Sequence, residues 1–168
     1  MSTPIIPIKE FDAEMASTRK LLARVPSDKG EWKPHEKSFS LGHLTQLVSR
    51  MPEWIARTLR EPSINLTGGP GYSYEKTETL LEMFDKGVAD ARSALETVTG
   101  AALDEPWSLM MGDRVLMTSP RGETTRGHLN HLIHHRGQLT VYLRLVDVPL
   151  SQVYGPTADD RTMPGQPH

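Results

Sequence analysis

The sequence predicts an all-α protein, a four-helix bundle with a short β-hairpin between its third and fourth helices and an extended C-terminal tail. Three observations lead to this fold class. Four segments repeat apolar residues every three or four positions, which is the spacing of one helix face. The length suits one hydrophobic core, so residues 1–168 are expected to form a single domain. Cysteine is absent, so the core must be stable without disulfides.

The first two helices are predicted on either side of a polar, turn-rich loop. The first ends near Pro26, and its apolar face consists of Phe11, Met15, Thr18, Leu22 and Val25. The second begins after a cap at Ser38 or Ser40. Its apolar stripe consists of Leu44, Leu47, Val48, Met51, Ile55 and Leu59. Pro52 lies within this stripe and is expected to kink or divide the helix, because proline lacks an N–H and clashes with the preceding turn.

The second half of the chain is predicted to hold two longer helices separated by the hairpin. A loop rich in glycine and proline, 61–76, precedes a third helix that stops near Gly100. The apolar face of this helix consists of Leu80, Leu81, Phe84, Val88, Ala91, Leu95 and Val98. Residues 107–118 favour two short strands around a Gly112-Asp113 turn. The fourth helix runs from about Thr124 to Val146, and residues 147–168, with four prolines, are expected to be extended.

Histidines are concentrated in this last helix, where four of the seven lie between His128 and His135. His131 and His135 are four residues apart, so both rings project from one face, about 6 Å apart along the axis. This is the spacing by which a helix supplies two imidazoles to one divalent ion. A third ligand from another helix would leave coordination positions open for water or substrate. The alternative interpretation is that these are surface or core histidines bonded to their neighbours.

Other side chains of the last helix are expected to surround this pair. His128 lies on the same stripe nearly two turns away, and His134 points elsewhere, toward a pocket or an interface. Gln138 is placed to hold a ligating imidazole in one tautomer, and Tyr142 to wall a pocket. Arg136 is expected to point away from the stripe and pair at a surface. A second, partly apolar face for another helix or a second subunit consists of Leu129, Ile133 and Thr140.

Several segments together resemble a known family. The most specific is the run N-H-L-I-H-H-R-G-Q-L at 130–139, followed by V-Y-L-R-L at 141–145. Three others support it: W-K-P-H-E-K-S at 32–38, S-L-G-H-L at 40–44 and Y-G-P-T-A-D at 154–159. On these motifs the sequence resembles the DinB-like (DinB/YfiT) superfamily of metalloenzymes, and the resemblance covers most of the chain.

The resemblance implies an up-down-down-up four-helix bundle, often dimeric, that binds a divalent ion through three histidines. Two of them come from an H-x3-H in the last helix, which His131 and His135 match. The third comes from S-x-G-E-L-x-x-H in the second helix, but that position is Leu47 here, and His43 occupies the place of the usual glutamate. The ligands expected on this basis are His43, His131 and His135, with Zn, Ni or Fe as the ion, or no ion at all.

Two classes of function stay open at this point. The first is a metal-dependent transferase or hydrolase, such as a thiol-dependent S-transferase, whose thiol would arrive as a cosubstrate because the chain has no cysteine. The second is a non-catalytic, dimeric small-molecule-binding or stress-related protein that has lost the second-helix ligand. A net charge of −2 does not favour nucleic acid as a partner. No apolar run is long enough to span a membrane and no signal peptide is evident, so a cytoplasmic protein is expected.

Overall fold

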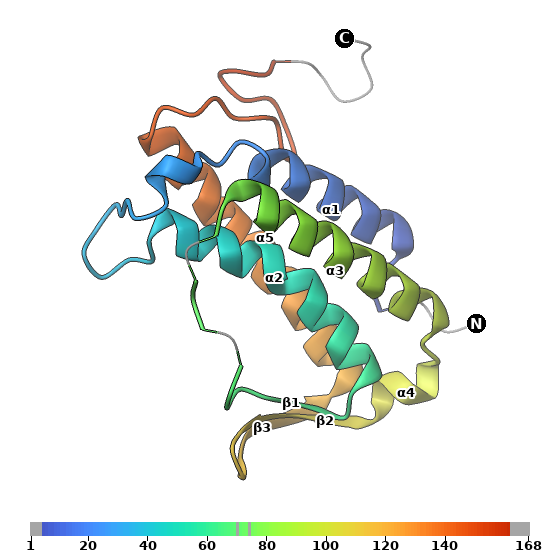
Figure 1. Cartoon of the computed structure of the whole chain (residues 1–168). Helices are drawn as coiled ribbons and strands as arrows, with labels where there is room; N and C mark the ends of the chain where they lie inside the picture. The colour runs from blue at the N-terminus through green and yellow to red at the C-terminus, as the bar shows by residue number, and fades with distance from the viewer. Residues whose placement is uncertain (1–4, 70, 74, 162–168) are drawn as a thin grey trace.

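The computed structural model describes residues 5–69, 71–73 and 75–161, and it is mostly helical (Figure 1). Four long helices run through it: α1 (Ile8–Leu22), α2 (Leu41–Arg60), α3 (Thr77–Thr97) and α5 (Arg121–Leu145). A 3-10 turn, η1 (Ser27–Lys29), follows α1, and a short helix, α4 (Gly100–Asp104), follows α3. Within the described ranges, none of the helices has the length and apolar character to cross a bilayer. Residues 148–161 form neither helix nor strand, and 162–168 of the expected tail lie outside the described residues.

The apolar faces of the long helices meet in one core, as their periodicity predicted. Fully or almost fully buried members include Phe11 and Met15 of α1, Val48 and Ile55 of α2, Phe84 of α3, and Leu132 and Leu139 of α5. The second helix does not divide at Pro52, because α2 continues to Arg60. Gly87 of α3 lies against this point, where an added Cβ would come within 3.0 Å of the Glu53 backbone nitrogen. A glycine there lets α3 approach α2 closely.

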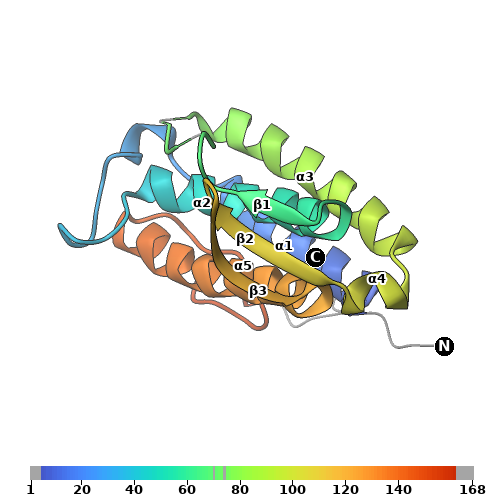
Figure 2. The same ribbon diagram turned by 90° about the horizontal axis from the view of Figure 1, so that it is seen from below.

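A small three-stranded sheet lies at one end of the long helices, so the fold is not purely α (Figure 2). It comprises β1 (Ser63–Asn65), β2 (Pro106–Met111) and β3 (Arg114–Pro120), in the order β1-β2-β3. The two strands expected around Gly112 are β2 and β3, which pair antiparallel, whereas β1 was not predicted and pairs parallel to β2. The Asn65 amide bonds both the N–H and the C=O of Gly112, at 3.0 and 2.9 Å, and so ties β1 to the turn.

Helices α2 and α5 carry most of the residues of the candidate site. Ser40 caps α2, because its Oγ accepts a hydrogen bond from the His43 N–H at 3.2 Å, which places His43 in the first turn. Helix α5 begins at Arg121, three residues before the expected Thr124. The buried Arg121 guanidinium donates to the carbonyl oxygens of Thr58 and Glu61 at 2.8 and 2.7 Å. These bonds attach the start of α5 to the end of α2.

Candidate functional site

A pair of facing imidazoles lies in the middle of α5. The Nε2 atoms of His131 and His135 are 2.7 Å apart, and the Nδ1 of His135 lies 2.7 Å from the Gln138 Oε1. An amide oxygen only accepts hydrogen bonds, so the Nδ1 of His135 carries the proton and its Nε2 presents a lone pair. His131 then donates its own Nε2–H to that lone pair. Spacing of one helical turn therefore produces the contact that the sequence predicted between these two residues.

This pair has the geometry of two ligands for one divalent ion. Two imidazole nitrogens that share an ion at about 2.0–2.1 Å lie roughly 3.0–3.4 Å apart. The observed 2.7 Å is a few tenths of an ångström shorter, so a small separation of the rings suffices. Gln138 holds His135 in the tautomer that ligation needs. His135 is 8% exposed and His131 is more exposed, but partial burial, and to a lesser degree the neighbouring His135 and His134, lowers the pKa of His131. A lowered pKa favours the neutral form that binds metal.

A third ligand does not join this pair in the structure. Across residues 5–69, 71–73 and 75–161, no three His, Cys, Asp or Glu side chains gather where they could hold one ion. The His43 ring instead stacks on Tyr72, with centroids 4.6 Å apart, and lies 4.3 Å from the Phe39 ring. Phe39 also approaches His135, at 6.5 Å between centroids. Burial, with a smaller contribution from Lys33, lowers the pKa of His43 and keeps it neutral.

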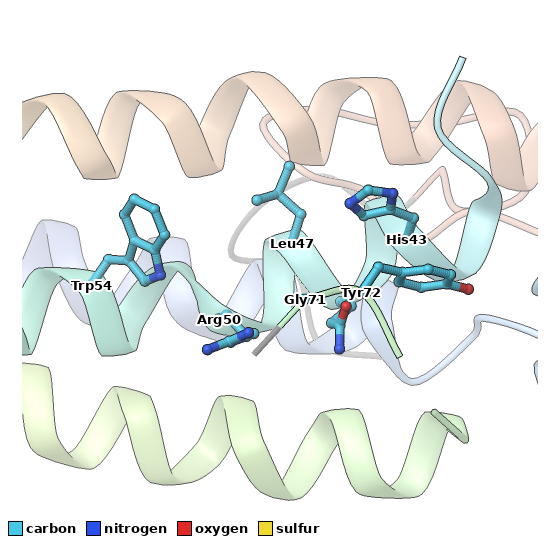
Figure 3. Close-up of a pocket in the computed structure, with 7 residues that line it drawn as sticks. His43, Leu47, Arg50, Trp54, Gly71 and Tyr72 are labelled. Carbon is cyan, nitrogen blue, oxygen red and sulfur yellow. The ribbon is translucent and has the colours of Figure 1, made fainter. Parts of the chain in front are cut away.

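A cavity of about 250 Å³ runs along α2 beside His43. His43, Leu47 and Trp54 project from α2 toward α5, whereas Arg50 points away from α5 (Figure 3). Leu47 therefore presents hydrocarbon at the position where the resemblance implied a histidine. Tyr72 closes the cavity from the loop before α3. Sequence reasoning missed Tyr72 and Phe39, since both lie in loops without periodicity, and an aromatic residue in a polar loop was the one signal available.

The other side chains expected near the pair have separate environments. His134 is exposed, with its ring 5.0 Å from that of His135, and Tyr142 packs edge-on against Trp32 at 5.7 Å. His128 contacts Thr58, with its Nε2 3.1 Å from the Thr58 Oγ1. Burial, and to a lesser degree the charge of His131, lowers the pKa of His128 to about 4. His128 is therefore a neutral side chain between α5 and α2.

One expectation for α5 was wrong because α1 covers more of this helix than its periodicity indicated. Arg136 is 1% exposed rather than at the surface, and it forms an ion pair with Glu14 of α1 at 2.6 Å. Its guanidinium also donates to the Tyr154 hydroxyl at 2.7 Å, which holds the C-terminal segment against the helices. Leu129 was expected on a face that packs on another helix or a second subunit, and the first alternative holds, because it is fully buried in the core that the helices form.

The chain is similar to known proteins both in sequence and in fold. A family model described as the DinB family matches residues 7–166. A DinB-like protein of Bacillus subtilis superposes with a TM-score of 0.67 at 20% identity, over 92% of this chain and 98% of that one. A DinB-like protein of Bacillus cereus superposes with a TM-score of 0.66 at 21% identity, over 87% of this chain and 94% of that one. No curated protein matches the sequence. At these identities the structural likeness concerns the fold.

Proposed function

This chain belongs to the DinB family, and from that premise we propose that it is a divalent-metal-dependent enzyme acting on a small molecule. In this proposal His131 and His135 bind the ion from α5, and the cavity beside His43 and Leu47 holds the substrate. The observation that carries the proposal is the pair of facing Nε2 atoms, 2.7 Å apart, with Gln138 fixing the tautomer of His135. Such an arrangement is typical of a metal-ligating histidine with its outer hydrogen-bond partner.

In this proposal the enzyme transfers a thiol or another small group. A bound ion would lower the pKa of a coordinated thiol or water and so supply a nucleophile at neutral pH. The chain has no cysteine of its own, so a thiol would enter as a cosubstrate. Leu47 and Trp54 offer apolar surface for the carbon skeleton of a substrate, and His43, held between Phe39 and Tyr72, offers a neutral imidazole beside it.

Leu47 favours a second candidate function, a non-catalytic protein that keeps the fold and binds a small molecule without metal. Its hydrocarbon side chain points toward α5 at the position of the usual histidine, and the described residues supply no third ligand to His131 and His135. For either function a homodimer is part of the proposal. Val141 and Leu145, both exposed on α5, are apolar residues on which a second subunit could pack. Light scattering on the purified protein would measure its oligomeric state.

Metal content tests the proposal and separates the two candidates. Protein purified without a nickel column is reconstituted with Zn²⁺ at pH 8, where imidazoles are neutral, and analysed by mass spectrometry. We expect about one ion per chain, lost in His131→Ala and His135→Ala. His35→Ala, which removes an exposed loop histidine, is the matched control and should keep the ion.

Leu47→His supplies the decisive comparison. An ion that binds only after this substitution would establish the non-catalytic candidate, because the site would then lack a single ligand. Failure of both the natural protein and Leu47→His to take up any ion would refute metal binding at His131 and His135. Loss of the ion in His43→Ala would show that His43 is the third ligand.

A further inference from the structure

A second cavity lies between α2, the sheet and the first turns of α5. Its volume is about 400 Å³, within the roughly 300–1,000 Å³ of small-molecule sites. Its lining includes Trp54 of α2, Trp107 and Leu109 of β2, Met117 of β3, and Thr124 and His128 of α5. Trp54 also lines the cavity beside His43, so the two cavities adjoin along α2. The His131 and His135 pair takes no part in lining this second cavity.

Three aromatic rings of this cavity are held in fixed positions by different elements. The His128 ring meets Trp54 edge-on, at 5.5 Å and 85°, and meets Trp107 edge-on, at 6.2 Å and 86°. The bond from His128 to Thr58 orients the imidazole, and Trp107 is almost completely buried. Rings that are already in place cost little conformational entropy when a ligand binds. The site is therefore preorganised for flat apolar surface.

The charges of the residues that line this cavity indicate which class of ligand it can bind. Among the described residues, neither lysine nor arginine lines this cavity, and Glu123, at the exposed side, is the one carboxylate. His128 is uncharged at neutral pH because burial lowers its pKa. No described side chain in the lining could neutralise the charge of a bound anion. The edges and faces of the aromatic side chains instead favour contact with another aromatic ring.

We propose that this cavity is a binding site for an uncharged aromatic molecule of one or two rings. The ligand packs against Trp54 and the edge of His128, above the almost completely buried Trp107, with Met117 at the opening. Binding involves neither His131 nor His135, so it occurs in protein freed of metal. The proposal is thus independent of the metal-dependent function and is tested in the presence of a chelator.

Indole is the probe, and the tryptophan side-chain N–H resonances of ¹⁵N-labelled protein are the readout. The chain has three tryptophans, and Trp32 packs on Tyr142 away from this cavity. We expect indole to shift the resonances of Trp54 and Trp107 in a saturable manner and to leave Trp32 unchanged. The Trp107 Nε1 atom has no hydrogen-bond partner among the described residues, which makes its resonance a sensitive reporter. No shift of Trp54 and Trp107 up to the solubility of indole would overturn the proposal.

Two glycines of α5 provide an occluding variant and its matched control. Gly127 lines the cavity, and a Cβ added there meets nothing within 4 Å, so Gly127→Leu should introduce its side chain at the cavity without a clash at Cβ. Gly137 is equally open but does not line the cavity. We expect Gly127→Leu to weaken indole binding by at least about tenfold and Gly137→Leu to leave it unchanged. Indole binding that survives Gly127→Leu would place the ligand elsewhere and refute the site.

The charge argument is tested with indole-3-carboxylate, the same ring with a negative charge. It should bind at least about tenfold more weakly than indole, and equal or tighter binding would refute the proposed ligand class. If Gly127→Leu loses the dispersed spectrum of a folded protein, Met117→Arg is used to test whether the ligand binds in this cavity. A cation at the opening should reverse the preference toward the carboxylate, and an unchanged preference would overturn the proposed position.

Discussion

Acidification is expected to weaken the fold through His128, which is held neutral between α2 and α5. Burial lowers its pKa from 6.5 to about 4, so between these values the unfolded chain binds a proton that the folded chain does not. Unfolding then takes up a proton, and stability falls as the pH falls. At pH 7 both forms are largely neutral. At pH 5 the folded imidazole stays mostly neutral while the unfolded one is charged, which costs about 2 kcal/mol. Below pH 4 the loss levels off near about 3 kcal/mol.

Urea unfolding followed by circular dichroism at pH 7, 6 and 5 measures this effect. The control is His128→Gln, which cannot titrate but keeps an amide that can bond the Thr58 hydroxyl. Between pH 7 and pH 5 the natural protein should lose about 2 kcal/mol more than the variant does. The pKa of His131 is also lowered, but its contribution is present in both proteins and cancels. Equal losses in the two proteins would refute the argument, because His128 would then titrate alike in the folded and unfolded chains.

Four further substitutions test other local features of the structure. Gln138→Ala should weaken binding of Zn²⁺ about 10–100-fold in a competition titration, because the Nδ1 of His135 loses its hydrogen-bond partner. Unchanged affinity would show that the bond from His135 to Gln138 does not orient His135 for metal binding. Arg136→Met should lower the free energy of unfolding, measured by chemical denaturation, by about 3–5 kcal/mol, because the Glu14 carboxylate loses its buried partner. A decrease below about 1 kcal/mol would mean that water reaches Glu14. Gly127→Ala should raise the free energy of unfolding by about 0.5–1 kcal/mol, because its added Cβ meets open space in a helix. Gly42→Ala should lower the free energy of unfolding by about 1 kcal/mol or more, because its Cβ would lie 2.8 Å from the Tyr72 Oη and 3.1 Å from the Gly30 oxygen. Equal thermal stability of Gly127→Ala and Gly42→Ala would contradict both predictions.

Local sequence pattern was sufficient to predict the apolar faces of three long helices and the positions of the residues that make two contacts in the site. Apolar spacing placed the core faces of α1, α2 and α3, because a helix that packs on one side must repeat its apolar residues at that side. The same geometry predicted that His131 and His135, four residues apart, share one face of α5 and that Gln138 flanks them; in the structure both His131 and Gln138 contact His135. Both contacts lie within one helix, so chain periodicity alone determines them.

Contacts between distant segments were decided only by the tertiary structure. Strand β1 has three residues, too few to show a period, and its partner β2 lies more than forty residues away in the chain. Arg136 looked like a surface residue until α1 placed Glu14 against it, since a buried guanidinium needs its carboxylate and no local pattern reveals one across 122 residues.

The site around the histidines likewise combines features that the sequence predicts with features that only the tertiary structure decides. Sequence alone determined that α5 carries two imidazoles on one face and that Leu47 occupies the position at which the resemblance implied a third histidine. Only the packing of a loop against α2 decided that His43 stacks on Tyr72, and only the approach of β2 to α5 decided that Trp107 and His128 share a cavity. The physical reason is that helical spacing is a property of adjacent residues, whereas a cavity is formed by elements that meet only after the chain has folded.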